Sequence, residues 1–260
     1  ASLFAAAVFA SSAAPAPDSS RGGAAPVPVY AILSLIGDRL DIIVRRTQTG
    51  THINNNLRDI VPIAEPVFDN SAVTAAAKAI ARAQPKAELA AINTRSAALF
   101  DKQRSLFVDD KGVLMMPDAI RDAVRAQGAT KLVLITKHRD DALFKFATGT
   151  RDGAGKLEGL GFYVDGTWET RSVDEVSGTY RIGQGFIAPY AYIGVTLADF
   201  PSGVIRGRKN MTASFMAGAG KAERDIGEPW NALSSADKVR LVNRLVEREV
   251  GAAMDELIAK

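Results

Sequence analysis

The sequence predicts a single α/β domain in which helices flank a mixed β-sheet, and three stretches carry this prediction. Residues 132–135 (LVLI) are four unbroken aliphatic residues, a pattern typical of a strand buried on both faces. Residues 190–215 contain two strand-like runs joined by a Pro-Ser-Gly turn. Residues 235–258 place their apolar side chains along one stripe, as an amphipathic helix does. Together they predict alternating strands and helices around one core.

The chain enters this domain through two apolar runs. Residues 29–36 and 40–44 lie on either side of Gly37-Asp38, a dipeptide that favours a tight turn, so we expect a hairpin. The polar residues 45–58 have no period and are expected to form a loop. Residues 89–92 are a candidate short strand.

Three helices are expected from capping signals. The Asp-Asn-Ser run at 69–71 can cap a helix over residues 69–84. Pro117 suits the first position of a second helix, over 117–127. A serine directly precedes the third helix, at 235–258, and an aspartate follows three residues later, as in a capping box.

Residues 145–186 are punctuated by glycines, which predicts an excursion of hairpins or loops inserted in the domain. Tyr163 and Trp168 lie in it, and strand alternation turns Phe162 to the core and Tyr163 away from it. Aromatic side chains are enriched at the centres of interfaces, so we expect Tyr163 and Trp168 to be exposed partner contacts. The alternative is that both belong to the core.

Composition excludes several classes of site. The formal net charge is +3, from 32 basic and 29 acidic residues, and no basic stripe with interleaved aromatics occurs, so nucleic acid is not an expected partner. The chain has no cysteine, which excludes disulfides and thiolate sites. With His52 and His138 as the only histidines, a histidine-rich metal site is impossible, and we expect no cofactor.

The first residues indicate export. Residues 3–14 (LFAAAVFASSAA) are apolar and then small, and they resemble the second half of a secretory signal. Residues 15–28 are rich in Ala, Pro and Gly and are expected to be a linker. We expect a periplasmic or otherwise exported protein with residues 1–16 removed or disordered, the alternative being a disordered leader on a cytosolic protein. No other stretch approaches the length of a membrane span.

Catalytic motifs are incomplete. Gly37-Asp38-Arg39-Leu40 follows an apolar run as the Gly-Asp-Ser-Leu block of SGNH esterases does, but Arg39 stands where that block has its serine nucleophile. No Gly-x-Ser-x-Gly elbow occurs, and no strand-to-helix turn carries the glycines of a phosphate loop.

A charged run directly after the buried strand is the candidate ligand loop, because α/β proteins often bind ligands beyond the carboxyl ends of strands. The alternative is a solvated loop with ordinary ion pairs. Arg206, Arg208 and Lys209 are interpreted as a solvated strand end rather than an anion site. The candidate ligand loop consists of Lys137, His138, Arg139, Asp140 and Asp141.

The order of elements, with Leu-Ala-Asp-Phe-Pro-Ser-Gly-Val at 197–204 as a strand-turn-strand motif, resembles the α/β domain of bacterial envelope proteins related to CsgG and the N-terminal domain of TolB. The chain departs from that group in its opening hairpin, in residues 145–186 and in having no lipidated cysteine. The resemblance implies a non-catalytic envelope component that binds other envelope proteins or takes part in their assembly. The alternative is a hydrolase-type enzyme with a carboxylate-based site.

Overall fold

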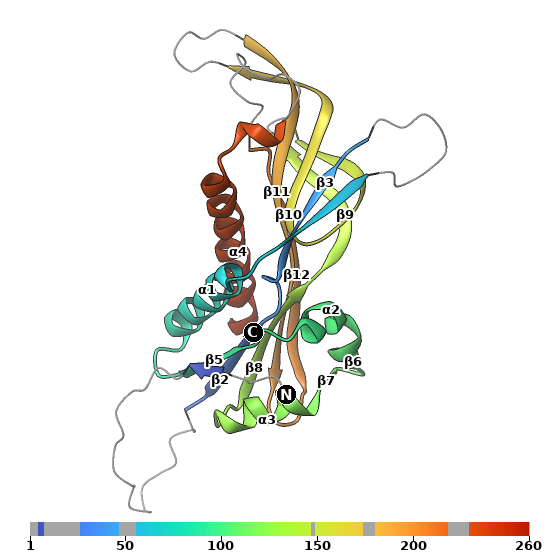
Figure 1. Cartoon of the computed structure of the whole chain (residues 1–260). Coiled ribbons are helices and arrows are strands. Elements are labelled where there is room, and N and C mark those ends of the chain that lie inside the picture. The colour runs from blue at the N-terminus through green and yellow to red at the C-terminus, as the bar shows by residue number, and fades with distance from the viewer. Residues whose placement is uncertain are drawn as a thin grey trace, which may run out of the picture.

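The computed structural model describes residues 5–7, 27–46, 56–146, 149–173, 180–217 and 229–259. Within that part of the chain ten strands form one mixed sheet, and β6 (Val108–Asp110) and β7 (Val113–Met115) form a separate hairpin. Helices cover both faces of the sheet (Figure 1), which confirms the predicted α/β domain. Most of the expected signal-like segment and linker lies outside the described residues.

One half of the sheet is built around β8 (Lys131–Lys137), the strand predicted from its aliphatic run. β8 pairs in parallel with β2 (Val29–Ser34), which pairs in parallel with β5 (Glu88–Asn93). On its other side β8 runs antiparallel to β11 (Tyr180–Asp199). Residues 132–135 are all buried, which confirms that this strand is covered on both faces. At the outer edge β5 pairs with β1 (Ala5–Ala7).

The other half of the sheet is built from the glycine-rich region. β10 (Gly149–Val173) runs antiparallel to β11 and, on its other side, parallel to β3 (Arg39–Val44). β4 (Leu57–Pro62) pairs with β3 and forms the edge of the sheet. The expected hairpins are therefore present, although they belong to the main sheet. The loop expected over residues 45–58 is wrong at residues 57 and 58, which begin β4.

The predicted hairpin between β2 and β3 is also wrong. Strand directions in the sheet show that β3 continues in the direction of β2, and the two strands are not neighbours. Asp69 explains the straight passage, because Oδ1 of Asp69 accepts hydrogen bonds from the backbone nitrogens of Ile36 (3.0 Å) and Gly37 (3.2 Å). The same oxygen accepts from the hydroxyl of Ser34 at 2.6 Å. A buried carboxylate thus holds a segment that local turn chemistry would have reversed.

The three predicted helices are present. α1 (Val67–Ala83) and α4 (Ser235–Ile258) pack side by side on one face of the sheet, and α3 (Asp118–Ala126) lies on the opposite face (Figure 1). The cap of α4 is as predicted, since the hydroxyl of Ser234 accepts from the backbone nitrogen of Asp237 at 3.1 Å. α1 begins two residues before the expected cap, because Asp69 bonds to the strand connection instead. A fourth helix, α2 (Ala97–Leu106), was not predicted and covers the same core as α3.

The predicted strand-turn-strand over 190–215 is confirmed, with β11 joined to the antiparallel β12 (Ile205–Ser214) and φ of +74° at Gly203 in the turn. Successive side chains of β11 point alternately to the two faces of the sheet. Ile193 and Val195 join the core under α1 and α4. On the opposite face, Tyr192 joins a core under β9 (Arg139–Phe146), and Ala198 joins the core under α2 and α3. That face therefore carries two cores with a gap between them.

Candidate functional site

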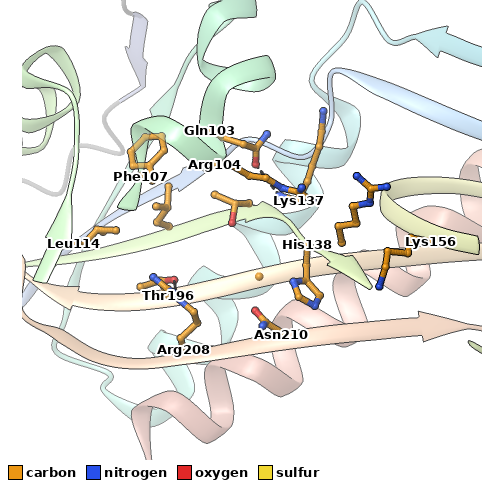
Figure 2. Close-up of a pocket in the computed structure, with 14 residues that line it drawn as sticks. Gln103, Arg104, Phe107, Leu114, Lys137, His138, Lys156, Thr196, Arg208 and Asn210 are labelled. Carbon is orange, nitrogen blue, oxygen red and sulfur yellow. Dashed lines mark hydrogen bonds between the residues drawn. The ribbon is translucent and has the colours of Figure 1, made fainter. Parts of the chain in front are cut away.

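The gap between the two cores is a cavity of about 620 Å³ on the face opposite α1 and α4 (Figure 2). Its floor is formed by β8, β11 and β12. One wall is formed by α2 and β7, and the other by the start of β9 together with Lys156 of β10. Six of the described lining residues carry basic groups and none is Asp or Glu. The lining consists of Gln103, Arg104, Phe107, Leu114, Leu134, Thr136, Lys137, His138, Arg139, Lys156, Gly194, Thr196, Arg208 and Asn210.

The cavity floor is polar because of two rows of residues that lie across three strands. In one row Gly194 lies between Thr136 of β8 and Asn210 of β12. A Cβ added at Gly194 would lie 3.3 Å from Oγ1 of Thr136 and 3.4 Å from Oδ1 of Asn210. The missing side chain therefore leaves the floor open between a hydroxyl and an amide, both of which can donate hydrogen bonds.

The next row of the floor contains Thr196 and Arg208. Nε of Arg208 donates to Oγ1 of Thr196 at 3.1 Å, and a guanidinium nitrogen of Arg208 lies 3.5 Å from Asp109. The Arg208 side chain is 39% exposed, so solvent screening weakens this ion pair. Arg208 lines the cavity and is the basic residue of its floor.

The wall formed by α2 is fixed by one buried amide. Nε2 of Gln103 donates to the backbone oxygens of Leu35 (3.1 Å) and Phe100 (2.7 Å), and Oε1 of Gln103 accepts from the backbone nitrogen of Lys137 at 2.7 Å. The next residue, Arg104, forms an ion pair of 3.0 Å with Glu158 of β10. Gln103 and Arg104 thus join α2 to β8 and β10.

The basic end of the cavity is held over the sheet by Tyr192. Its hydroxyl accepts from the backbone nitrogen of Leu143 and donates to the backbone oxygen of Asp141, each at 3.0 Å, which ties β9 to β11. Burial is the largest of the effects that raise the pKa of Tyr192, so the hydroxyl stays protonated and able to donate. His138, directly before β9, and Lys156 are thereby placed at the same end of the cavity.

The carboxylates near the basic end lie against basic side chains and are not in the lining. Asp140 lies 3.5 Å from Nε2 of His138, and Asp141 lies 2.8 Å from Nζ of Lys156. The pKa of Asp140 is lowered, first by the hydrogen bond from the backbone nitrogen of Asp141 and then by His138. Arg139 makes no ion pair with any residue that the structure describes.

Lys137 differs from the other paired basic residues of the lining because its side chain is buried. Its Nζ forms a buried ion pair with Asp38, and its side chain is 4% exposed. Arg39 and Asp41 continue this charged group, and Arg39 bonds to Asp101 of α2 at 3.2 Å. Lys137 therefore belongs to the structural support of the cavity, and its ammonium is not free for a ligand.

The candidate ligand loop is a strand for most of its length, which corrects the expected loop conformation. Lys137 ends β8, and Arg139, Asp140 and Asp141 begin β9 after a single residue, His138. Lys137, His138 and Arg139 line the cavity, whereas the two aspartates do not. Whether these residues bind a ligand stays a prediction.

The expected exposed aromatic pair is not supported at Tyr163. Its side chain is 1% exposed and packs against Phe144, with ring centroids 4.5 Å apart. The expectation of an exposed Tyr163 is wrong because β9 covers the face of the sheet to which this residue points. The side chain of Trp168 lies outside the described residues.

Several lining residues were missed by sequence reasoning. Gly194 and Thr196 interrupt the apolar side chains that β11 turns to the cavity face, and this is the signal that could have located the floor. Arg208 was interpreted as part of a solvated strand end, whereas it lines the cavity; Arg206 pairs with Asp199 and Lys209 with Glu256.

Within the described residues, no group of three or more His, Asp or Glu side chains is arranged to hold a metal ion. None of the described helices is long and apolar enough to span a membrane.

Comparisons with known proteins do not identify a family. No protein-family model matches the chain, and no curated protein matches it. Among solved structures, the crystal structure of protein XCC0632 from Xanthomonas campestris, described as DUF330, has a TM-score of 0.38 and 10% sequence identity. The match covers 89% of this chain and 84% of that chain. At this TM-score the likeness assigns no function, and no comparison links the chain to CsgG or TolB.

Proposed function

We propose that this chain is a non-catalytic binding component of the cell envelope, and that the cavity on the sheet receives an anionic group of its ligand. The observation that carries the proposal is the lining, which has six basic residues, one of them (Lys137) held in a buried ion pair, and, among the described residues, no carboxylate. Opposite charges at a partly enclosed site attract more strongly than they do in bulk water. A cavity of this size is also within the range of small-molecule sites.

The floor supports the same proposal. Thr136, Thr196 and Asn210 carry donors that can bond to the oxygens of a carboxylate, phosphate or sulfate. Hydrogen bonds in which one partner is charged are roughly twice as strong as neutral ones. Basic groups at the rim and neutral donors on the floor form a set suited to an oxyanion.

The lining does not favour the alternative of a carboxylate-based hydrolase. Such an enzyme needs a pair of carboxyl groups on either side of the reacting bond. The described aspartates beside the lining residues each lie against a basic side chain: Asp38 against Lys137, Asp109 against Arg208, Asp140 against His138 and Asp141 against Lys156. The cavity is therefore proposed as a binding site.

The setting of this binding component is also a proposal. Residues 3–14 have the composition of a secretory signal, which supports an exported or periplasmic location. The order of strands and helices, together with the motif at 197–204, supports a place among envelope proteins that bind one another. In that setting the ligand would be held during assembly rather than chemically changed.

Calorimetric titration of the protein with inorganic phosphate at low ionic strength tests the anion site. The informative variant is Arg139→Ala with Lys156→Ala, which removes two cations from one end of the cavity. We expect at least a tenfold loss of affinity, and a similar weakening of the wild type when salt is raised. The matched control is Lys78→Ala with Arg244→Ala, which removes the same two charge types from exposed positions on α1 and α4. Equal affinities for the two double variants, or no binding by the wild type, would contradict the proposal.

A further inference from the structure

The two ends of the cavity differ in chemistry. At one end lie Phe107, Leu114 and Leu134, which belong to the core under α2 and α3. At the other end lie His138 and Lys156 (Figure 2). Arg208 lies in the row of Leu134, but three basic side chains, those of His138, Arg139 and Lys156, gather at the second end.

The apolar end is part of the cavity surface although it is mostly withdrawn from solvent. Phe107 is 9% exposed and Leu114 is 3% exposed, and both line the cavity. Covering such a wall with an apolar group is favourable at roughly 25 cal/mol per Å² of apolar surface removed from water. The wall would therefore add affinity for a ligand that carries an apolar group.

The distance between the two ends is set by β8. Leu134 and His138 are four residues apart along the chain, so their positions are separated by roughly 13 Å at the rise of an extended strand. Between them lie Thr136 and the open position at Gly194. A ligand that reaches both ends must be elongated and must cross this polar floor.

We propose that the ligand of this cavity is an amphipathic anion, with an apolar chain against Phe107, Leu114 and Leu134 and an oxyanion at His138, Arg139 and Lys156. This inference rests on the proposed function and specifies its ligand class. The charge and the apolar surface of the cavity complement such a ligand at opposite ends. Phosphate and carboxylate head groups share the required chemistry, and titration with one probe of each kind separates them.

The test compares four probes below their micelle concentrations by calorimetry: octyl phosphate, octanoate, inorganic phosphate and octanol. We expect octyl phosphate to bind at least thirtyfold more tightly than inorganic phosphate, with a negative heat-capacity change from apolar burial. Octanol, which has the chain without the charge, should bind at least tenfold more weakly than octyl phosphate. The ratio of octyl phosphate to octanoate identifies the preferred head group.

The outcomes separate this inference from the proposed function. Equal binding of inorganic phosphate and octyl phosphate would overturn the amphipathic ligand and leave the anion site standing. Equal binding of octanol and octyl phosphate would overturn both, since charge would then contribute nothing.

A variant at the apolar end locates the chain. Phe107→Gln should weaken octyl phosphate at least fivefold and leave inorganic phosphate unchanged, while Val239→Gln on α4, an exposed apolar control, should change neither. Circular dichroism checks that the Phe107 variant folds. If the variant does not fold, the comparison of the four probes on the wild-type protein tests the amphipathic ligand. An unchanged affinity for octyl phosphate in the folded variant would contradict the assigned position of the chain.

Discussion

The backbone nitrogen of Lys137 donates a hydrogen bond of 2.7 Å to Oε1 of Gln103, which joins the end of β8 to α2. This contact places the helical wall of the cavity directly beside its floor. Gln103 is 4% exposed and also bonds to the backbone oxygens of Leu35 and Phe100. One amide thus satisfies groups from three segments that are distant in sequence.

Replacement of Gln103 should therefore be costly. We expect Gln103→Ala to lower the free energy of unfolding by about 2 to 3 kcal/mol, because it leaves buried backbone groups of Leu35 and Lys137 without partners. Urea denaturation measures the change. Lys102→Ala, at the exposed neighbouring position of α2, should alter stability by less than about 0.5 kcal/mol. A Gln103 variant as stable as the Lys102 variant would show that the contact is not made.

Asp69 should make stability depend on pH. Burial is the largest effect on this carboxyl, and it raises the pKa above the ordinary value of 3.8 even though Ser34 and two backbone nitrogens donate to it. The folded chain then holds the proton more tightly than the unfolded chain does. The contribution of Asp69 to the free energy of unfolding is greatest below the ordinary pKa and falls as pH rises through the raised value.

Asp69→Asn should remove this contribution, because an amide keeps an acceptor oxygen without a titrating charge. We expect the difference in stability between the Asn variant and the wild type to shift in favour of the variant as pH rises from about 4 towards neutrality. The control Asp59→Asn changes an exposed carboxyl on β4 and should show no such trend. A difference that is constant with pH would contradict the raised pKa of Asp69.

Two glycines on opposite faces of the sheet should respond differently to alanine. A Cβ at Gly207 would lie 2.6 Å from Cδ2 of Leu257 in α4, whereas a Cβ at Gly194 would meet its nearest atoms at 3.3 Å or more. We expect Gly207→Ala to lower the free energy of unfolding by about 1 to 3 kcal/mol through overpacking, and Gly194→Ala to lower it by less. Thermal denaturation compares them, and the opposite order would show that the faces are assigned wrongly.

A larger side chain at Gly194 should act on binding. Gly194→Val suits a strand and fills the open floor, so we expect at least a tenfold loss of octyl phosphate affinity in a protein that still folds. Retained affinity in the folded variant would place the ligand elsewhere.

Tyr163 should behave as a core residue. We expect Tyr163→Ala to lower the free energy of unfolding by about 3 to 5 kcal/mol, as truncation of a buried aromatic does, and Tyr163→Phe to cost much less because the ring contact with Phe144 remains. Chemical denaturation of both variants measures this. An alanine variant of wild-type stability would restore the exposed surface predicted from sequence.

The sequence predicts elements whose signal is local and fails where distant contacts decide. β8 and α4 were predicted from an aliphatic run and from a helical stripe with its cap, and both signals lie within the element. The turn expected at Gly37 did not form because Asp69, which is far along the chain, binds that segment. The orientation of Tyr163 was predicted correctly as opposite to Phe162, but the strand that covers it, β9, could not be placed from periodicity.

The cavity residues, too, could be predicted only where their signal is local. Lys137, His138 and Arg139 were candidates because they follow a buried strand, and the structure places them in the lining. Gln103 and Arg104 come from a helix that was not predicted, and Arg208 reaches the cavity only through the pairing of β12 with β11. A site assembled from so many elements requires the tertiary fold.

The most direct test of the central claim, that this cavity binds an anionic ligand, is a two-dimensional amide NMR titration of the ¹⁵N-labelled protein with octyl phosphate. We expect saturable shifts that are largest at the backbone amides of Thr136, His138, Gly194, Thr196 and Asn210, with residues of α4 unmoved. Shifts confined to α4 or to the exposed strand β4, with the floor of the cavity unchanged at saturation, would contradict it.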